Sequence, residues 1–245
     1  MEYTVMDNAI YVTLSKQLAQ FRQMDAIASN IANANTTAYK PETVLFHDYI
    51  VTDADDKKIA YTQDVGSYRD HSVGTLKTTG NPLDLALSDN AYFVVQTTQG
   101  ERYTRAGNFQ LDGNKTLVNA DGYPVLDAGG QPIVFQQEDR NIRIAEDGMI
   151  IVDGEERGQL NIVSFENEQF LKEEGGTLYN ADAAQPKPAI GFKVSQGMLE
   201  ESGVEPVMEM TNMITTLRRV GSTSQFIETA YELQRQAIET YGKQN

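Results

Sequence analysis

The stretch Ala28-Ser29-Asn30-Ile31-Ala32-Asn33-Ala34-Asn35-Thr36-Thr37-Ala38-Tyr39-Lys40 divides the chain into two kinds of sequence. Before it, apolar residues recur with the spacing of a helix. After it, strand-forming and turn-forming residues dominate. Asn33 and Asn35 tolerate the left-handed backbone that often ends a helix, and the Thr-Thr-x-Tyr run that follows favours an extended backbone. We therefore expect a long N-terminal helix to end in this stretch and a β-rich body to follow it.

The segment before this stretch predicts one helix over residues 4–34, which contain no proline. Its apolar residues alternate between spacings of three and four, the pattern of a coiled-coil seam. Gln17 is a polar position within that seam. The seam residues are Ile10, Leu14, Gln17, Phe21, Met24, Ala28 and Ile31.

Residues 206–245 repeat this pattern after Pro206, a residue that suits the first turn of a helix. Two interpretations remain open for these helices: they pack on the chain's own body, or they pair with each other and with other copies of the chain. In the second case the apolar seam residues of both helices form a subunit interface. The C-terminal seam residues are Met210, Met213, Leu217, Val220, Ser224, Ile227, Tyr231, Gln234, Ile238 and Tyr241.

The central part of the chain predicts a β domain. Short apolar runs such as residues 92–95 and 160–165 alternate with turn pairs such as Asp121-Gly122 and Asp153-Gly154. Many short strands at regular spacing indicate an antiparallel sandwich or irregular barrel. We therefore assign the chain to the α+β class. Its expected parts are a discontinuous, coiled-coil-like helical domain of residues 1–38 and 206–245, an extended connector with short strands at 39–79, and a β-rich domain at 80–205.

The charge of the chain is concentrated in its centre. The net charge is −15 over 245 residues, and the segments 1–40 and 206–245 each hold equal numbers of acidic and basic residues. The whole excess of acid therefore lies in residues 41–205. A body this acidic repels nucleic acid and anionic lipid. The neutral ends could crowd together in an assembly, although the acidic composition is equally explained by solubility.

Other features of the composition limit the chemistry and the location. The chain has no cysteine, so disulfides and thiolate chemistry are excluded. No apolar run is long enough to span a bilayer. The acidic N-terminus lacks the basic and apolar segments of a secretory signal, which by itself would suggest a cytosolic protein.

The sequence contains few candidate catalytic or metal-binding patterns. The two histidines, His47 and His71, both lie in the polar connector. The clusters Asp53-Asp55-Asp56 and Asp112-Gly113-Asn114 superficially resemble calcium loops but lack the EF-hand spacing. There is no nucleophile elbow or phosphate loop. The abundance of Asp and Glu leaves a pair of carboxylates at glycosidase spacing as an open alternative. We expect no enzyme activity, metal or cofactor.

Three segments resemble the flagellar basal-body rod and hook protein family, and their order and spacing match that family. The first extends from Asn30 to Lys40, the second from Gly80 to Leu126, and the third from Gln196 to Ile214. The opening residues 6–15 are most similar to the proximal-rod branch. Ala38 stands where the family usually has glycine. The residues that carry the resemblance are Asn30, Asn33, Asn35, Thr36, Thr37, Tyr39, Lys40, Gly80, Asn81, Pro82, Leu83, Asp84, Tyr103, Thr104, Arg105, Gly107, Phe109, Gly197, Leu199, Glu200 and Ser202.

The resemblance implies a structural role. Members of this family are exported through the flagellar type III apparatus without a cleaved signal and polymerise helically in the periplasm. Their terminal helices line the export channel of the rod, and their β domains lie outside. The implied partners are copies of the chain, homologous rod subunits and the export apparatus, with no nucleic acid and no direct insertion into a membrane. The distal rod and the hook are the alternatives within the family. Outside it, the alternatives are a cell-wall carbohydrate-active enzyme and a β-rich binding module with a coiled-coil stalk.

Overall fold

The structure is a computed structural model that describes residues 2–52, 58–175, 177–181 and 184–242. It divides into two compact units. The first unit contains residues 1–32, 42–69 and 205–245, and the second contains residues 33–41 and 70–204. No helix within the described ranges has the length and apolar character needed to cross a membrane.

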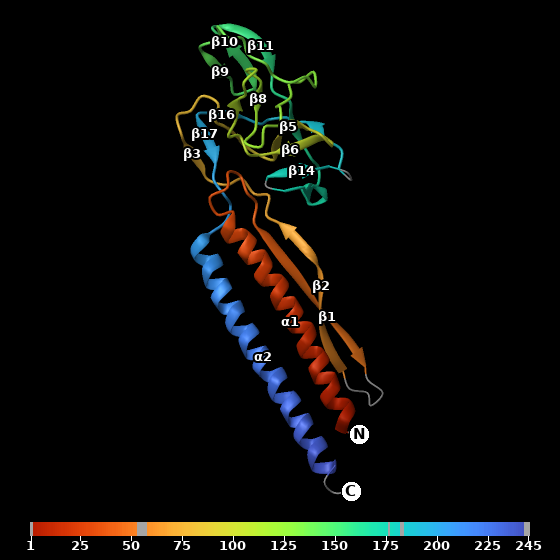
Figure 1. The fold of residues 1–245 in the computed structure, drawn as a ribbon. Helices are drawn as coiled ribbons and strands as arrows, with labels where there is room; N and C mark the ends of the chain where they lie inside the picture. Colours follow the sequence, from red (N-terminus) through yellow and green to blue (C-terminus); the bar gives the residue numbers. More distant parts are fainter. Residues whose placement is uncertain (1, 53–57, 176, 182–183, 243–245) are drawn as a thin grey trace. The chain divides into compact units, whose positions relative to one another are not determined.

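The first unit is built on two long helices, α1 (Glu2–Ala32) and α2 (Pro206–Gly242). They run antiparallel and side by side, with their free ends at the same end of the unit (Figure 1). The two polar seam positions meet, since Gln17 Nε2 donates to Ser224 Oγ at 2.8 Å. The structure thus has both predicted helices, and α2 begins at Pro206 as expected. A coiled coil with other copies of the chain stays a prediction.

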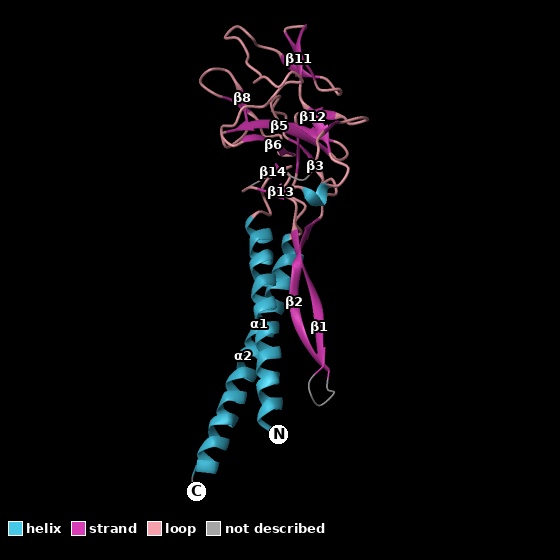
Figure 2. Cartoon of the chain, turned by 90° about the vertical axis from the view of Figure 1, so that its right-hand side faces the viewer, coloured by secondary structure: helices cyan, strands magenta, loops and turns pink. Residues whose placement is uncertain are grey.

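A long β-hairpin lies against the other side of α1 in the same unit (Figures 1 and 2). Its antiparallel strands are β1 (Glu42–Thr52) and β2 (Lys58–Arg69), with a break in register at Leu45/Phe46. The Asn30 side chain fixes the start of β1, because its amide donates to Glu42 O at 3.0 Å and accepts from Glu42 N at 2.9 Å.

The expectation of an extended connector with short strands therefore fails over the hairpin residues. All side chains of β1 from His47 onward are exposed. Because neither face of that stretch is consistently buried, the sequence shows no clean alternation of apolar and polar residues, and this is the signal that normally identifies a strand.

The second unit contains the remaining strands, all of them paired antiparallel. Its largest sheet has six strands in the order β13-β14-β6-β5-β12-β15, accompanied by one three-stranded and three two-stranded sheets. The elements are β3 (Leu76–Thr78), β4 (Leu85–Leu87), β5 (Ala91–Thr97), β6 (Gly100–Thr104), β7 (Gln110–Leu111), β8 (Leu117–Val118), β9 (Ile142–Ile144), β10 (Met149–Val152), β11 (Glu155–Gln159), β12 (Ile162–Ser164), the 3₁₀ helix η1 (Glu168–Phe170), β13 (Lys172–Glu173), β14 (Leu178–Asn180), β15 (Lys187–Pro188), β16 (Val194–Gln196) and β17 (Met198–Glu200).

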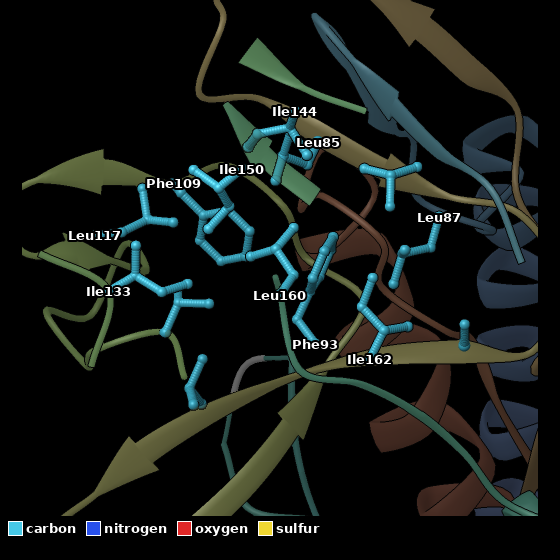
Figure 3. Packing of buried hydrophobic residues seen from close by; sticks show 14 of the residues in the cluster. Leu85, Leu87, Phe93, Phe109, Leu117, Ile133, Ile144, Ile150, Leu160 and Ile162 are labelled. Atoms are coloured by element: carbon cyan, nitrogen blue, oxygen red, sulfur yellow. The ribbon is translucent and has the colours of Figure 1, made fainter. Parts of the chain in front are cut away.

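Strand β5 organises the core of this unit because both of its faces are buried. Phe93 and Val95 point into the larger apolar cluster, which Figure 3 shows packed around Phe93 and Phe109. Tyr92 and Val94 point into a second cluster on the other face of the strand. Successive side chains of a strand alternate between faces, so this continuous apolar run lets one strand contribute to two cores.

Candidate functional site

The three family-motif segments meet in the second unit at a buried cluster of charges, formed by Lys40, Arg105 and Glu200. One Glu200 oxygen lies 2.5 Å from Lys40 Nζ and the other lies 2.9 Å from Arg105 Nε. All three side chains are at least 99 % buried. We call this cluster the clasp, because one carboxylate joins residues from three distant parts of the sequence.

Backbone groups complete the hydrogen bonding of the clasp. Lys40 Nζ donates to Ser72 O at 2.5 Å, and Gly74 N donates to Glu200 Oε1 at 2.8 Å. The Arg105 guanidinium also donates to three carbonyl oxygens around β5. Because buried charges are costly unless paired and hydrogen-bonded, this complete coordination is what makes the cluster compatible with the core. The three acceptors are the carbonyl oxygens of Leu87, Asp89 and Ala91.

The backbone turn after α1 delivers Lys40 to the clasp. Ala38 adopts a left-handed backbone with φ of 55°, and its N–H donates to Glu200 O at 2.9 Å. Gly203 N in turn donates to Tyr39 O at 2.9 Å. A left-handed alanine costs about 1–2 kcal/mol, so the two backbone bonds to residues 200–203 help to hold a turn that glycine would adopt freely.

The buried, charged environment of the clasp shifts two pKa values. Burial, which disfavours a charged amine, lowers the pKa of Lys40, although the adjacent carboxylate opposes the shift. Burial alone would raise the pKa of Glu200, but the positive charges of Arg105 and Lys40 outweigh it and hold that pKa below its ordinary value. Glu200 is therefore ionised at neutral pH. Both oxygens of its carboxylate already form ion pairs within the fold, one with Lys40 and the other with Arg105.

The Asn81-Pro82-Leu83-Asp84 motif forms a tight turn next to the clasp segments. The Asp84 carboxylate accepts from Thr79 Oγ1 at 2.6 Å and from Asn81 Nδ2 at 3.0 Å. Asp84 O accepts from Gly197 N at 2.8 Å, and Gly80 N donates to Gly197 O at 3.1 Å. The second and third motif segments are thus joined by backbone bonds as well as by the clasp.

The other motif residues occupy less central positions. Asn33 and Thr36 form a local turn, with Thr36 Oγ1 donating to Asn33 Oδ1 at 3.0 Å. Tyr103, Thr104 and Phe109 are buried in the body of the second unit. Asn35 is exposed, whereas Thr37, Leu199 and Ser202 are half-buried.

The predicted seam residues form apolar rows on the two helices of the first unit. Several large ones are exposed in the single chain: Phe21 keeps 41 % and Leu217 keeps 51 % of its surface. The exposed members are Leu14, Phe21, Leu217, Tyr231 and Ile238, and the half-buried ones are Ile10, Met24, Ile31, Met213, Val220 and Ile227. The chain by itself therefore leaves much of this apolar surface in contact with water.

Sequence reasoning missed several residues of the second unit. It did not find the backbone contributions of Ser72 and Gly74 to the clasp, for which no side-chain signal exists. It also placed His71 in a polar connector, whereas the ring is buried, with Nδ1 3.2 Å from the Tyr92 hydroxyl. The available signal was the presence of Lys40, Arg105 and Glu200 within otherwise turn-rich or apolar motifs, since charged residues in such segments are rarely buried unless paired.

The structure describes one of the two candidate calcium loops. Residues 53–56 lie outside the described residues. Asp112 Oδ1 accepts from Asn114 N at 2.9 Å and from Thr116 N at 2.7 Å, which is the hydrogen bonding of a turn. Within the described ranges, no group of three or more His, Cys, Asp or Glu residues is arranged to hold a metal ion.

Comparison with known protein families gives matches to three separate parts of the chain. The family model described as "Flagella basal body rod protein" matches residues 10–40, "Flagellar hook protein FlgE/F/G D1 domain" matches 86–152, and "Flagellar basal body rod FlgEFG protein C-terminal" matches 195–240. These ranges contain Lys40, Arg105 and Glu200 respectively.

Individual relatives match over a larger share of the chain. The flagellar basal-body rod protein FlgF of Caulobacter vibrioides is 35 % identical, covering 98 % of this chain and 100 % of the relative. FlgF of Mesorhizobium japonicum is 32 % identical with the same coverage. The flagellar basal-body rod protein FlgG of Bacillus subtilis is 34 % identical, covering 88 % of this chain and 92 % of the relative. The chain therefore belongs to the flagellar basal-body rod protein family, whose members are structural.

Proposed function

We propose that this structural rod subunit is an axial component of the proximal rod, where it polymerises helically with copies of itself and with homologous rod subunits. In this role it transmits torque and encloses the export channel. The proposal rests on the apolar surface that both helices of the first unit expose to solvent. Leu14, Leu18 and Phe21 are exposed on α1, and Ile214, Leu217, Phe226, Tyr231, Leu233 and Ile238 are exposed on α2.

Exposed apolar surface on this scale favours association. Burying one leucine or phenylalanine side chain contributes about 1.5–3 kcal/mol, so neighbouring helices that covered these rows would gain substantial free energy for each subunit. Large exposed apolar patches on soluble proteins commonly mark interaction sites. The neutral charge of residues 1–40 and 206–245 adds no net repulsion between neighbouring subunits.

The proposed arrangement assigns a place to each part of the chain. The helical ends, residues 1–38 and 206–245, form the inner layer that lines the channel, and the β-rich residues 80–205 form the outer layer. The subunit reaches the periplasm through the flagellar type III export apparatus without cleavage of a signal and acts without catalysis. The similarity of residues 6–15 to the proximal-rod branch supports the proximal position.

The test is complementation followed by imaging. A strain lacking the gene should lose its rods and its motility and recover both with the wild-type chain. A density map of isolated basal bodies should then place the chain in the proximal rod with both helices facing the channel. Density in the distal rod or the hook would reassign the chain within the family. A closed oligomer in solution, together with normal rods in the deletion strain, would favour the binding-module alternative.

A further inference from the structure

A polar groove crosses the first unit where its three elements meet. Residues of α1 lie next to α2 on one side and next to the β1–β2 hairpin on the other (Figures 1 and 2). The residues from α1 follow helical spacing, as do those from α2, so each set forms one face. The groove is lined by Lys16, Ala19, Gln20 and Gln23 of α1, Phe46 and Thr62 of the hairpin, and Arg219, Ser222 and Thr223 of α2.

Gln20 is the unusual residue of this groove. Its side chain is 93 % buried, since only 7 % of its surface is exposed, and its Oε1 has no hydrogen-bond partner among the described residues. A buried amide oxygen without a partner costs free energy. The single chain therefore leaves in this groove an acceptor that still needs a hydrogen-bond donor.

Two basic side chains of the groove also lack partners in the described part of the chain. Lys16 and Arg219 are exposed and form no ion pair there, whereas the neighbouring Arg22 lies 3.3 Å from Asp64 and Arg235 lies 3.5 Å from Glu239. Two cations without a carboxylate partner in the described ranges therefore line one groove of a chain whose net charge is −15.

We propose that this groove receives an acidic side chain of a second copy of the chain during rod assembly, an inference that rests on the proposed function. A carboxylate entering the groove would accept hydrogen bonds from Lys16 and Arg219. An ammonium has three N–H donors, and Lys16 lies one turn before Gln20 on the same face of α1. Once drawn into the groove by the carboxylate, Lys16 can therefore also donate to Gln20 Oε1.

A copy of the same chain fits this groove by charge and by position. Its residues 41–205 hold the entire excess of acidic side chains. Two groove residues are also sequence neighbours of predicted seam residues, since Phe21 follows Gln20 on α1 and Val220 follows Arg219 on α2. The acidic contact would add orientation to the non-directional attraction of the apolar rows.

The first test compares two charge reversals on adjacent residues of α2. Arg219→Glu places a negative charge in the groove, and Arg218→Glu makes the same change at a residue outside the groove lining. In the deletion strain, Arg219→Glu should lower the yield of complete basal bodies by about tenfold or more relative to wild type, while Arg218→Glu stays near wild type. Failure of the wild-type chain would refute the proposed function. Recovery by wild type with equal yields for the two variants would refute the groove alone.

A second test separates a docking role from a structural one. Gln20→Met removes the unpartnered amide but keeps the size of the side chain. The purified full chain should unfold at the same or a higher temperature, whereas the yield of basal bodies should fall. If Gln20 is only a packing residue, the yield will follow the stability and stay normal, and that result would overturn the proposal.

The identity of the occupant can be read from a photocrosslink. A benzophenone amino acid at Thr223 in isolated basal bodies should form an adduct with a peptide of a second copy that contains Asp or Glu. An adduct with another rod protein, or with a peptide lacking acidic residues, would contradict the assignment.

Discussion

Lys40 and Glu200 lie 160 positions apart in the sequence, yet their side chains form an ion pair with an Nζ–Oε1 distance of 2.5 Å. Lys40 belongs to the short segment that enters the second unit after α1, and Glu200 belongs to the segment that leaves it before α2. The other Glu200 oxygen pairs with Arg105, which follows β6 in the middle of the unit. One carboxylate therefore links the first, middle and last segments of the second unit.

The clasp should make a large contribution to the stability of the second unit. Glu200→Gln keeps the shape of the side chain but leaves the Lys40 and Arg105 charges without the carboxylate that they share. Breaking a buried ion pair at one partner costs about 3–5 kcal/mol. We expect a decrease of this size in the free energy of unfolding, measured by denaturant titration. Glu201→Gln is the control, because that exposed residue pairs with Lys77 at 3.6 Å and its loss should cost less than about 1 kcal/mol. Equal effects of the two substitutions would contradict the role of the clasp.

Acid should weaken the same cluster. The pKa of Glu200 in the folded chain lies below its ordinary value because Arg105 and Lys40 outweigh the opposing effect of burial, and an unperturbed glutamate has a pKa of about 4.3. A lowered pKa in the folded state gives stability that is fully present above the unfolded value and is lost as the pH falls through the folded value. The difference in unfolding midpoint between wild type and Glu200→Gln should therefore be largest at neutral pH and shrink below about pH 4. A difference that stays constant from pH 7 to pH 3 would show that the Glu200 charge does not contribute.

The sequence predicted the elements of this fold better than their contacts. Both helices and several strands of the second unit, such as β5 and β12, could be found because each follows a periodicity or is bounded by Gly and Asp turn residues. The hairpin could not, since much of β1 lacks a consistently buried face. The clasp also escaped prediction: a single sequence does not show which of its charges are buried, nor that three motifs carrying Lys40, Arg105 and Glu200 converge.

Gly107 should tolerate no side chain. A Cβ on this residue would lie 1.8 Å from the carbonyl oxygen of Leu85, whose N–H donates to Gly107 O at 2.9 Å. The obstruction is backbone within the core, so it cannot move aside without disrupting β4. Gly107→Ala should lower the free energy of unfolding by about 3 kcal/mol or more, as measured by thermal or denaturant melting. Gly158→Ala is the matched control, because nothing lies within 4 Å of its added Cβ. A Gly107→Ala protein as stable as this control would show that the approach to Leu85 is not tight.

The apolar rows of the helices should matter more for assembly than for the single chain. Phe21 and Leu217 are 41 % and 51 % exposed in the single chain, so replacing either with alanine removes few internal contacts. In an assembled rod the same side chains would be covered, where truncation to alanine typically costs about 2–5 kcal/mol. Phe21→Ala and Leu217→Ala should therefore reduce swimming and the yield of rods while the melting of the β-rich unit stays unchanged. Gln225→Ala, an exposed polar position of α2, is the control. Normal swimming in both apolar variants would show that the rows are not an interface.

The terminal helices should be largely unformed in the free monomer and should order on polymerisation. Among the side chains described on α2, a helix of 37 residues, only Thr216 is buried. A helix gains most of its stability by packing an apolar face, and ordering each residue costs roughly 1–2 kcal/mol. The contacts of α1 with α2, which include polar pairs such as Gln17 with Ser224, supply little burial against that cost. Neighbouring subunits would supply the rest, as in other cases of folding on binding.

Such a monomer could not polymerise before export and would need less unfolding to pass through a narrow channel. Hydrogen exchange on the dilute monomer tests this directly, because amides in unformed helices exchange rapidly whereas those of the second unit are protected. We expect little protection over residues 10–31 and 213–238, strong protection in β5 and β6, and a gain of helical protection when the chain is incorporated into rods. The control is Glu200→Gln, which should lower protection in the β-rich unit and leave the helical segments unchanged. Strong protection across both helical segments in the dilute wild-type monomer would instead establish a preformed helical hairpin, and the barrier to premature assembly would then have to lie elsewhere in the chain.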